Sequence, residues 1–352
     1  MMSDKKITIK NRSIGNGSPC FIIAEAGVNH NGKLGLAKKL IDAAKRAGAD
    51  AVKFQVFSAE DVVTKRAPKA AYQKRATGKG TQYEMLKELE LSESEFETLA
   101  KYAKRKGIVF LASAFSEEGV DLLERLGVPA FKVPSGEITN FPLLRHIARK
   151  GKPIILSTGM STLGEVQEAL EVMGKEGAEE IVLLHCVSNY PAKIEEVNLR
   201  AMETLRSAFG VPVGLSDHTV GITIPIAAVA IGASIVEKHL TLSKKLPGPD
   251  HKASLEPDEF KRMVVGIREV ERALGDGVKR PTKSEEIMKK IVRKSIVAKT
   301  SIPKGAIISK DMLEIKRPGT GLEPKYIDKI VGKKARKDIE AGEIIKSEKI
   351  VW

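Results

Sequence analysis

Residues 47–57 have the sequence AGADAVKFQVF and contain the unit that decides the fold. Gly48 follows the amphipathic stretch Leu34–Ala47, and a glycine in that place favours the end of a helix. In the next run, Ala51–Phe57, Lys53 and Gln55 alternate with apolar residues, which is typical of a β-strand. A helix followed at once by a strand predicts a repeating β/α architecture.

The same unit recurs through the first 275 residues. Short apolar runs predict strands at Cys20–Ala26, Ala51–Phe57, Ile108–Ala114, Pro129–Val133, Pro153–Ser157, Ile181–Cys186, Pro212–Leu215 and Ala233–Lys238. Amphipathic stretches predict helices at Leu34–Ala47, Glu93–Lys106, Glu117–Leu126, Thr162–Lys175, Asn198–Phe209, Ile222–Ile231 and Pro257–Leu274. Eight such units in roughly 250 residues predict a (β/α)₈ TIM barrel over residues 1–275. An open doubly wound sheet is the alternative, but no GxGxxG follows the first strand.

Two further segments differ from the repeat. Residues 58–91 separate the second strand from its helix and form either a lid over the site or a surface loop. After Leu274 the composition changes, so we expect a linker at 276–290 and a small β-rich domain at 291–352. Within that domain IPKGAIIS (302–309) is weakly repeated as IEAGEIIK (339–346). So small a module buries little apolar surface, and we expect it to dock on a barrel.

The overall composition excludes several classes of protein. Lys and Arg outnumber Asp and Glu by 59 to 45, but the two signs are interleaved and no nucleic-acid-binding motif is present. We therefore predict a Lys-rich soluble surface and no nucleic-acid partner. Cys20 and Cys186 are too far apart to form a CxxC unit. No apolar run approaches the length of a membrane span, and the N-terminus lacks a signal peptide, so we predict a cytoplasmic protein without membrane contact.

Polar residues stand at the ends of nearly all the predicted strands, where TIM barrels carry their catalytic groups. Alternation with apolar neighbours places Lys53 toward the barrel axis, where it needs an anionic partner. That partner is either a bound ligand or an internal carboxylate, Glu25 or Glu137. A second such lysine, Lys132, favours a bound polyanion.

His218 and His239 stand at the ends of the last two predicted strands. Imidazole is a good ligand for Mn, Fe, Co or Zn, and two histidines alone leave coordination positions open for water and substrate. A single buried histidine is more often a hydrogen-bonded core residue. His30, in the loop after the first strand, is either structural or in contact with substrate.

Several segments resemble the sialic acid synthase family, which includes relatives that make legionaminic and pseudaminic acids. They are IAEAGVNHNG (23–32), AVKFQ (51–55), FKVPSGE (131–137), IILSTGM (154–160), LHCVSNYP (184–191), GLSDHT (214–219), VEKHL (236–240), PGPD (247–250) and KRPGTG (316–321). The resemblance extends to the tail, which is similar to the family's SAF (antifreeze-protein-like) domain.

The resemblance implies an enzyme that condenses phosphoenolpyruvate (PEP) with the open-chain aldehyde of an N-acylated mannosamine-type sugar. It implies a divalent metal, usually Mn²⁺ but alternatively Mg²⁺ or Co²⁺, held by His218 and His239. The implied PEP-binding residues are Lys53, Ser113, Lys132, Ser135, Ser188 and Ser216. The implied sugar-binding residues are Glu25, Gln55, Tyr190, Asp250 and Arg317. Glu25 or Glu137 would move the proton of the attacking water, and the tail would close the partner subunit's barrel in a domain-swapped homodimer.

Some details stay open. Residues 112–116 are ASAFS where relatives often carry Thr-Pro-Phe-Ser, although Ser113 keeps the hydroxyl. Either Ser188 or Asn189 binds substrate. The sugar is N-acetylmannosamine, its 6-phosphate or a 2,4-diacetamido sugar, and we expect loop 58–91 to help select it. The alternative functions are another PEP-dependent keto-acid synthase, a Schiff-base aldolase using Lys53 or Lys132, and a non-catalytic carbohydrate- or nucleic-acid-binding protein.

Overall fold

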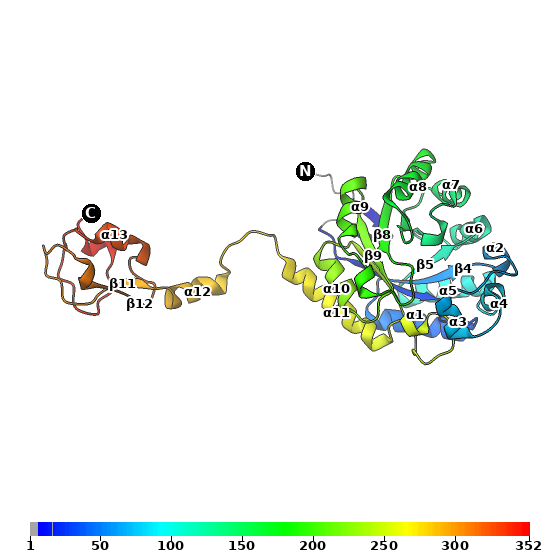
Figure 1. Ribbon diagram of the computed structural model, residues 1–352, viewed down its shortest axis with the longest axis horizontal. Helices are drawn as coiled ribbons and strands as arrows, with labels where there is room; N and C mark the ends of the chain where they lie inside the picture. Colours follow the sequence, from blue (N-terminus) through cyan, green and yellow to red (C-terminus); the bar gives the residue numbers. More distant parts are fainter. Residues whose placement is uncertain (1–5, 16) are drawn as a thin grey trace. The chain divides into compact units, whose positions relative to one another are not determined.

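The computed structural model describes residues 6–15 and 17–352. The chain forms two compact units, with the boundary between Gly275 and Asp276 (Figure 1). Within the described residues, no helix is both long and apolar enough to cross a membrane.

The first unit is a closed parallel barrel. Among the described residues, eight strands pair in the order β10-β3-β4-β5-β6-β7-β8-β9. They are β3 (Phe21–Gly27), β4 (Ala51–Val56), β5 (Val109–Ala114), β6 (Phe131–Val133), β7 (Ile154–Ser157), β8 (Ile181–Cys186), β9 (Val213–Asp217) and β10 (Ile235–His239). The predicted TIM barrel is confirmed, strand by strand.

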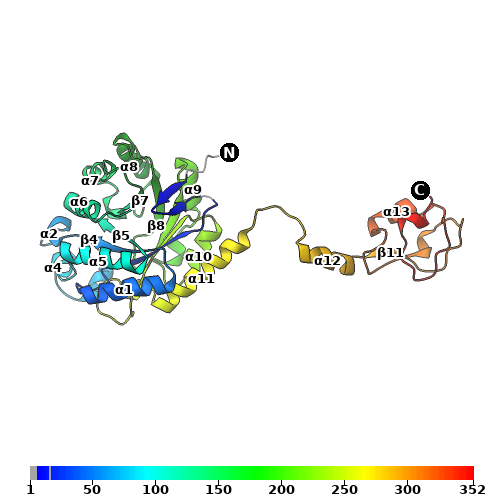
Figure 2. The same ribbon diagram turned by 180° about the vertical axis from the view of Figure 1, so that it is seen from behind.

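Helices form a ring around the barrel (Figures 1 and 2). The helices that follow the barrel strands are α1 (Leu34–Ala47), α5 (Glu93–Lys106), α6 (Glu117–Arg125), α7 (Phe141–Ala148), α8 (Leu163–Lys175), α9 (Ala201–Phe209), α10 (Thr223–Ala230) and α11 (Pro257–Leu274). Helix α11 packs against both α1 and α10, which closes the ring (Figure 2). Helix α7 was not predicted from the sequence.

The alternation in β4 places apolar side chains on the outer face of the barrel and polar side chains on its inner face. Val52, Phe54 and Val56 face outward into the apolar layer between strands and helices. Helix α1 ends at Gly48, whose φ of 88° is the left-handed conformation that glycine adopts most easily. The chain then turns directly into β4, and Lys53 is left on the inner face with 2% of its surface exposed.

The barrel interior is apolar toward the amino ends of the strands, and a hairpin that was not predicted covers that end. Strands β1 (Ile7–Ile9) and β2 (Arg12–Ile14) pair antiparallel. Their fully buried isoleucines, Ile7, Ile9 and Ile14, join inward-facing strand residues such as Ile23 and Leu111 in one cluster. Each buried isoleucine contributes roughly 1.5–3 kcal/mol. Polar groups are thereby confined to the carboxyl ends of the strands.

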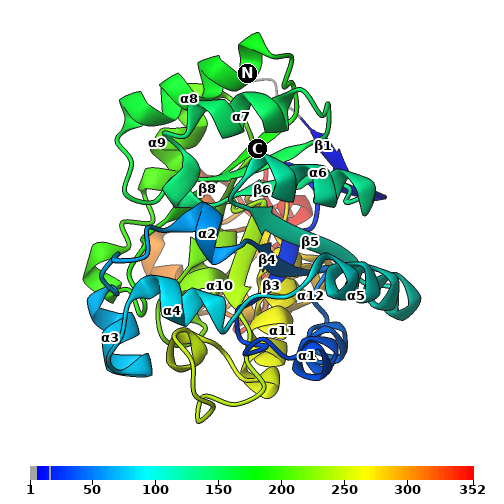
Figure 3. The ribbon, with the colours of Figure 1, turned by 90° about the vertical axis from the view of Figure 1, so that its right-hand side faces the viewer.

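Residues 58–91 contain three short helices, α2 (Ala59–Val62), α3 (Ala71–Thr77) and α4 (Gln82–Lys87), on the near side of the barrel in Figure 3. Met85 and Leu89 pack against Val28, which follows β3. This contact anchors the segment to the end of the barrel that carries the polar residues.

The second unit is small and rich in antiparallel pairing. It contains α12 (Lys283–Val292), β11 (Ser295–Ala298), β12 (Leu313–Lys316) and α13 (Ile327–Ile330). Helix α12 thus begins inside the segment expected as a linker. The two copies of the internal repeat pair with each other, because Ile302 and Ile339 exchange backbone hydrogen bonds of 2.8 and 2.9 Å.

Candidate functional site

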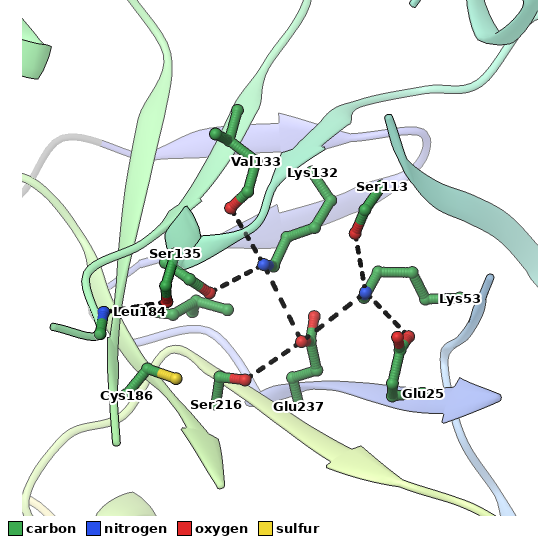
Figure 4. A network of polar contacts seen from close by, with 12 residues as sticks. Glu25, Lys53, Ser113, Lys132, Val133, Ser135, Leu184, Cys186, Ser216 and Glu237 are labelled. Atoms are coloured by element: carbon green, nitrogen blue, oxygen red, sulfur yellow. Dashed lines mark hydrogen bonds and ion pairs between the residues drawn. The ribbon is translucent and has the colours of Figure 1, made fainter. Parts of the chain in front are cut away.

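Lys53 in β4 and Lys132 in β6 lie buried on the inner face of the barrel (Figure 4). Lys53 Nζ donates to Ser113 Oγ at 3.0 Å and forms an ion pair with Glu25 at 2.8 Å. Lys132 Nζ donates to Ser157 Oγ at 2.7 Å and to the Val133 carbonyl at 3.1 Å. Of the internal partners considered for Lys53, the structure brings Glu25 to it.

Glu237, from β10, lies between the two lysines (Figure 4). Its Oε1 is 3.8 Å from Lys53 Nζ and 3.9 Å from Lys132 Nζ, and it accepts a hydrogen bond from Ser216 at 3.1 Å. Its other oxygen is buried and has no hydrogen-bond partner among the described residues. Glu237 was not among the predicted site residues, although the alternation Glu237-Lys238-His239 places it on the same face as His239.

Burial controls the protonation of this network. It raises the pKa of Glu25 to about 7, against the opposing charge of Lys53 and with the help of Glu237. Burial also lowers the pKa of Lys132 below its usual range, although Glu237 opposes the shift. A carboxyl group with a pKa near neutrality can both accept and return a proton under physiological conditions.

Serine hydroxyls lie beside the lysines. Ser135 Oγ accepts the Gly159 N–H at 2.9 Å. A Cβ on Gly159 would lie 2.8 Å from Ser135 Oγ and 2.3 Å from Ser188 Oγ, so both serines approach because residue 159 is glycine. Asn189 instead donates to Glu196 at 3.4 Å, an exposed bond. Of the two alternatives, Ser188 rather than Asn189 therefore lies with Ser135 beside Gly159. Ser157, which was not among the predicted PEP-binding residues, also belongs to these serines because it binds Lys132.

His218 and His239 lie side by side at the ends of β9 and β10, with ring centroids 5.5 Å apart and ring planes inclined at 62°. His218 Nδ1 lies 2.7 Å from the Val187 carbonyl and donates to it. Burial lowers the pKa of His218, but the nearby Cys186 and this hydrogen bond outweigh burial and raise the pKa above its usual value. Nδ1 of His239 is buried and has no hydrogen-bond partner in the described part of the chain.

The two imidazoles fit a divalent metal. Burial holds the pKa of His239 well below its usual value, with the charge of His218 acting in the same direction. His239 is therefore neutral, which is the form that binds metal. Residues 6–15 and 17–352 contain no group of three or more His, Cys, Asp or Glu side chains arranged to hold an ion. Water and substrate would have to complete the coordination, as expected for an open site.

Aromatic rings cover the histidines. The Tyr190 ring lies 4.0 Å from that of His218 and 5.5 Å from that of His239. Tyr72, from α3, stacks on Tyr190 at 5.2 Å. Tyr72 was not among the predicted site residues, and only its place in loop 58–91 could have indicated it. Asp250 is buried, and burial raises its pKa to about 6 while the charge of His218 opposes the shift.

Other predicted residues have different surroundings. Gln55 donates to Glu25 at 3.2 Å and so belongs to the network. Glu137, in the turn after β6, accepts from Asn140 at 2.7 Å, and no described contact joins it to the lysines. Arg317 is exposed in the second unit, so its proposed contact with sugar stays a prediction. His30 is buried against Phe54, which faces outward, and it therefore has a structural position.

Comparison with known proteins shows the family to which the chain belongs. Residues 40–279 match the NeuB family, and residues 293–351 match the SAF domain. The chain is 51% identical to the N,N'-diacetyllegionaminic acid synthase of Legionella pneumophila over 97% of both chains. It is 40% identical to human N-acetylneuraminate-9-phosphate synthase, over 96% of this chain and 94% of that one. The crystal structure of the N-acetylneuraminic acid synthetase of Leptospira borgpetersenii superposes with a TM-score of 0.72 at 37% identity, covering 81% of this chain and 95% of that one. The chain therefore belongs to the NeuB family and carries a SAF domain.

Proposed function

We propose that this protein is a nonulosonate synthase that condenses PEP with the open-chain aldehyde of an N-acyl amino sugar. The observation that carries the proposal is that the lysine network adjoins the two histidines. The charges of Lys53 and Lys132 act on His239, and a Cβ on Gly27 would lie 3.2 Å from Glu25 Oε1 and 3.6 Å from His239 Cε1. Such a site offers an anion-binding region next to a metal-binding region. The alkene carbon of PEP would form a bond to the aldehyde carbon. Water would then add to C2 of PEP, and phosphate would leave as the C2–O bond breaks.

The lysines and serines would hold the phosphate and carboxylate of PEP. Lys53 and Lys132 are fixed by their hydrogen bonds to Ser113 and Ser157, so their charges need no reorganisation during the reaction. The other proposed contacts to PEP come from Ser135, Ser188 and Ser216.

His218 and His239 would hold the metal, with Mn²⁺ as the first candidate and Mg²⁺ or Co²⁺ as alternatives. A metal held there would supply Lewis-acid polarisation of the aldehyde oxygen. Glu25 would take the proton of the attacking water, since its pKa of about 7 suits that role. Glu137 is the less favoured base, because its carboxylate already accepts from Asn140.

We propose a 2,4-diacetamido sugar as the first substrate to test. Two relatives that are each 51% identical to this chain are named N,N'-diacetyllegionaminic acid synthase, and that product carries two acetyl groups on nitrogen. N-acetylmannosamine and its 6-phosphate are the comparison substrates. Gln55, Tyr190 and Asp250 would contact the sugar within the barrel.

We also propose that the protein works in the cytoplasm as a domain-swapped homodimer. In that arrangement Arg317, in the SAF domain, would reach the N-acyl group of sugar bound in the partner's barrel. The exposure of Arg317 leaves its guanidinium available for such a contact.

The reaction can be tested by running it in H₂¹⁸O. If water adds to C2 and the C2–O bond breaks, the released phosphate contains no ¹⁸O. Phosphate that carries ¹⁸O would mean that water attacks phosphorus, and would contradict the proposed chemistry. A mass spectrum of the sugar product checks that a carbon–carbon bond has formed.

One observation favours a second candidate, a Schiff-base aldolase. Burial lowers the pKa of Lys132, and a lysine of lowered pKa is a better nucleophile toward a ketone. This enzyme would use pyruvate, and borohydride would trap pyruvate on Lys132. If the protein is a nonulosonate synthase, no pyruvate is trapped, because Lys132 then serves only as a cation.

A further inference from the structure

A buried ion pair joins β9 and β10 on the outer face of the barrel, behind the histidines. Asp217 and Lys238 are register partners on these strands. Lys238 Nζ lies 2.5 Å from Asp217 Oδ2, and both side chains are almost fully buried. Alternation places these residues outside the barrel, while their neighbours His218 and His239 face inward.

The pair also fixes the backbone on both sides of His218. Asp217 accepts the Thr219 N–H at 3.0 Å and the Thr219 hydroxyl at 3.0 Å. Lys238 donates to the Thr219 carbonyl at 2.5 Å. Thr219, which follows His218, is thus held by the carboxylate of Asp217, which precedes His218, and by the ammonium group of Lys238. Within this turn, His218 points its Nδ1 toward the Val187 carbonyl.

The same pair also holds the stretch of backbone that carries His239. It follows Lys238 directly in β10, and its Nδ1 has no hydrogen-bond partner among the described residues. No described bond from Nδ1 therefore orients this ring. Its direction follows from the backbone of β10, which Lys238 ties to β9, and from the packed Tyr190 ring.

We infer that the Asp217–Lys238 pair is a positioning device that aims His218 and His239 at a common metal ion. This inference rests on the metal centre of the proposed function. A buried ion pair adds little stability beyond well-packed apolar residues of similar size. If the pair served stability alone, apolar residues could replace it without consequence for the histidines.

The test compares three variants of the full-length chain. Lys238→Met breaks the pair, and the double variant Asp217→Leu/Lys238→Met removes both charges and leaves no unpaired one. Arg268→Met is the matched control, since Arg268 binds Asp50 at 3.1 Å and the Cys20 carbonyl at 2.9 Å, at the amino ends of β4 and β3. The readouts are thermal stability, the Kd for Mn²⁺, and ¹⁵N spectra of histidine-labelled protein, with His218→Ala to assign the His218 signals.

The inference predicts that the double variant regains most of the stability that Lys238→Met loses, yet binds Mn²⁺ about 10–100-fold more weakly than wild type. Its His218 signals lose the signature of a single Nδ1–H tautomer. Arg268→Met loses stability but keeps wild-type Mn²⁺ affinity and His218 signals. A double variant with wild-type affinity and unchanged His218 signals would overturn the inference. If the wild-type protein binds no Mn²⁺, the proposed metal centre fails, and the His218 signals alone decide whether the pair positions the ring.

Discussion

At the scale of the residue, Glu25 and Glu137 are the two candidates for the catalytic base. Glu25 is 1% exposed and contacts Lys53 and Gln55, whereas Glu137 contacts Asn140 in a half-buried turn. We predict that Glu25→Gln lowers kcat by about 10²–10⁴-fold, the usual contribution of a general acid–base group, with a small change in the KM for PEP. Steady-state kinetics of the variant measures both constants.

The matched variant is Glu137→Gln, which keeps a carbonyl acceptor for Asn140 and is expected to leave kcat near the wild-type value. A greater loss in Glu137→Gln than in Glu25→Gln would reverse the assignment.

Much of the site could be predicted residue by residue, and the reason is the period of the strand. Alternation alone placed Lys53 inside the barrel, and the structure confirms this placement. Alternation could not show that Glu237 lies between Lys53 and Lys132, because that depends on how the barrel brings β4, β6 and β10 together. Tyr72 was missed for a related reason, since its stacking on Tyr190 depends on the path of a long loop.

At the scale of the element, β9 approaches its neighbours so closely that one position excludes a side chain. A Cβ on Gly214 would lie 2.3 Å from the Ile235 carbonyl oxygen in β10 and 2.8 Å from Leu184 in β8. We predict that Gly214→Ala destabilises the protein by about 1–3 kcal/mol, because the strands must move apart to admit the methyl group. Urea denaturation measures the change.

Gly174, in α8, provides the opposite case. A Cβ there would meet nothing within 4 Å, and Gly174→Ala is expected to stabilise the protein by about 0.5–1 kcal/mol through the better helix propensity of alanine. Equal effects of the two substitutions would contradict the packing described for β9.

Long elements were the most predictable parts of the fold. The long amphipathic helices α1, α5 and α11 were predicted with the bounds that the structure shows. The hairpin of β1 and β2, with three residues in each strand, gives too few alternations to be recognised. Its role in sealing the barrel emerges only from the cluster that Ile7, Ile9 and Ile14 join.

At the scale of the whole molecule, stability should depend on pH through buried neutral histidines. Burial lowers the pKa of His30 and of His251 to about 4. As the pH falls below about 6.5, the unfolded chain takes up these protons before the folded chain does. Each histidine therefore contributes up to about 3 kcal/mol that is fully present above pH 6.5 and is lost as the pH falls toward 4.

We predict that the free energy of unfolding, measured in urea between pH 7 and 4.5, falls less steeply in His30→Gln than in wild type. Glutamine does not titrate in this range. An unchanged slope would mean that folding does not lower the pKa of His30.

The proposed domain-swapped dimer makes a prediction about mixed subunits. His218→Ala damages the barrel site and Arg317→Ala damages the contact that reaches the partner's barrel, so each homodimer should be inactive or strongly impaired. Random mixing makes about half of the dimers mixed, and a swapped arrangement gives each mixed dimer one intact site, so about a quarter of wild-type activity should return. Activity assays after co-refolding measure the recovery. No recovery, with mixed dimers confirmed by mass, would contradict a contribution of Arg317 across the dimer.

The proposed function is that this barrel joins PEP to an amino-sugar aldehyde at a metal held by His218 and His239. Its most direct test is the initial rate of phosphate release from PEP by metal-stripped protein. The assay is run with and without Mn²⁺ and with each of the three candidate sugars, and His218→Ala serves as the control. We predict release only with both metal and sugar, fastest with the 2,4-diacetamido sugar, and lost in the variant. Release that needs no metal, or none with any of the three sugars by folded, metal-loaded protein, would contradict the account.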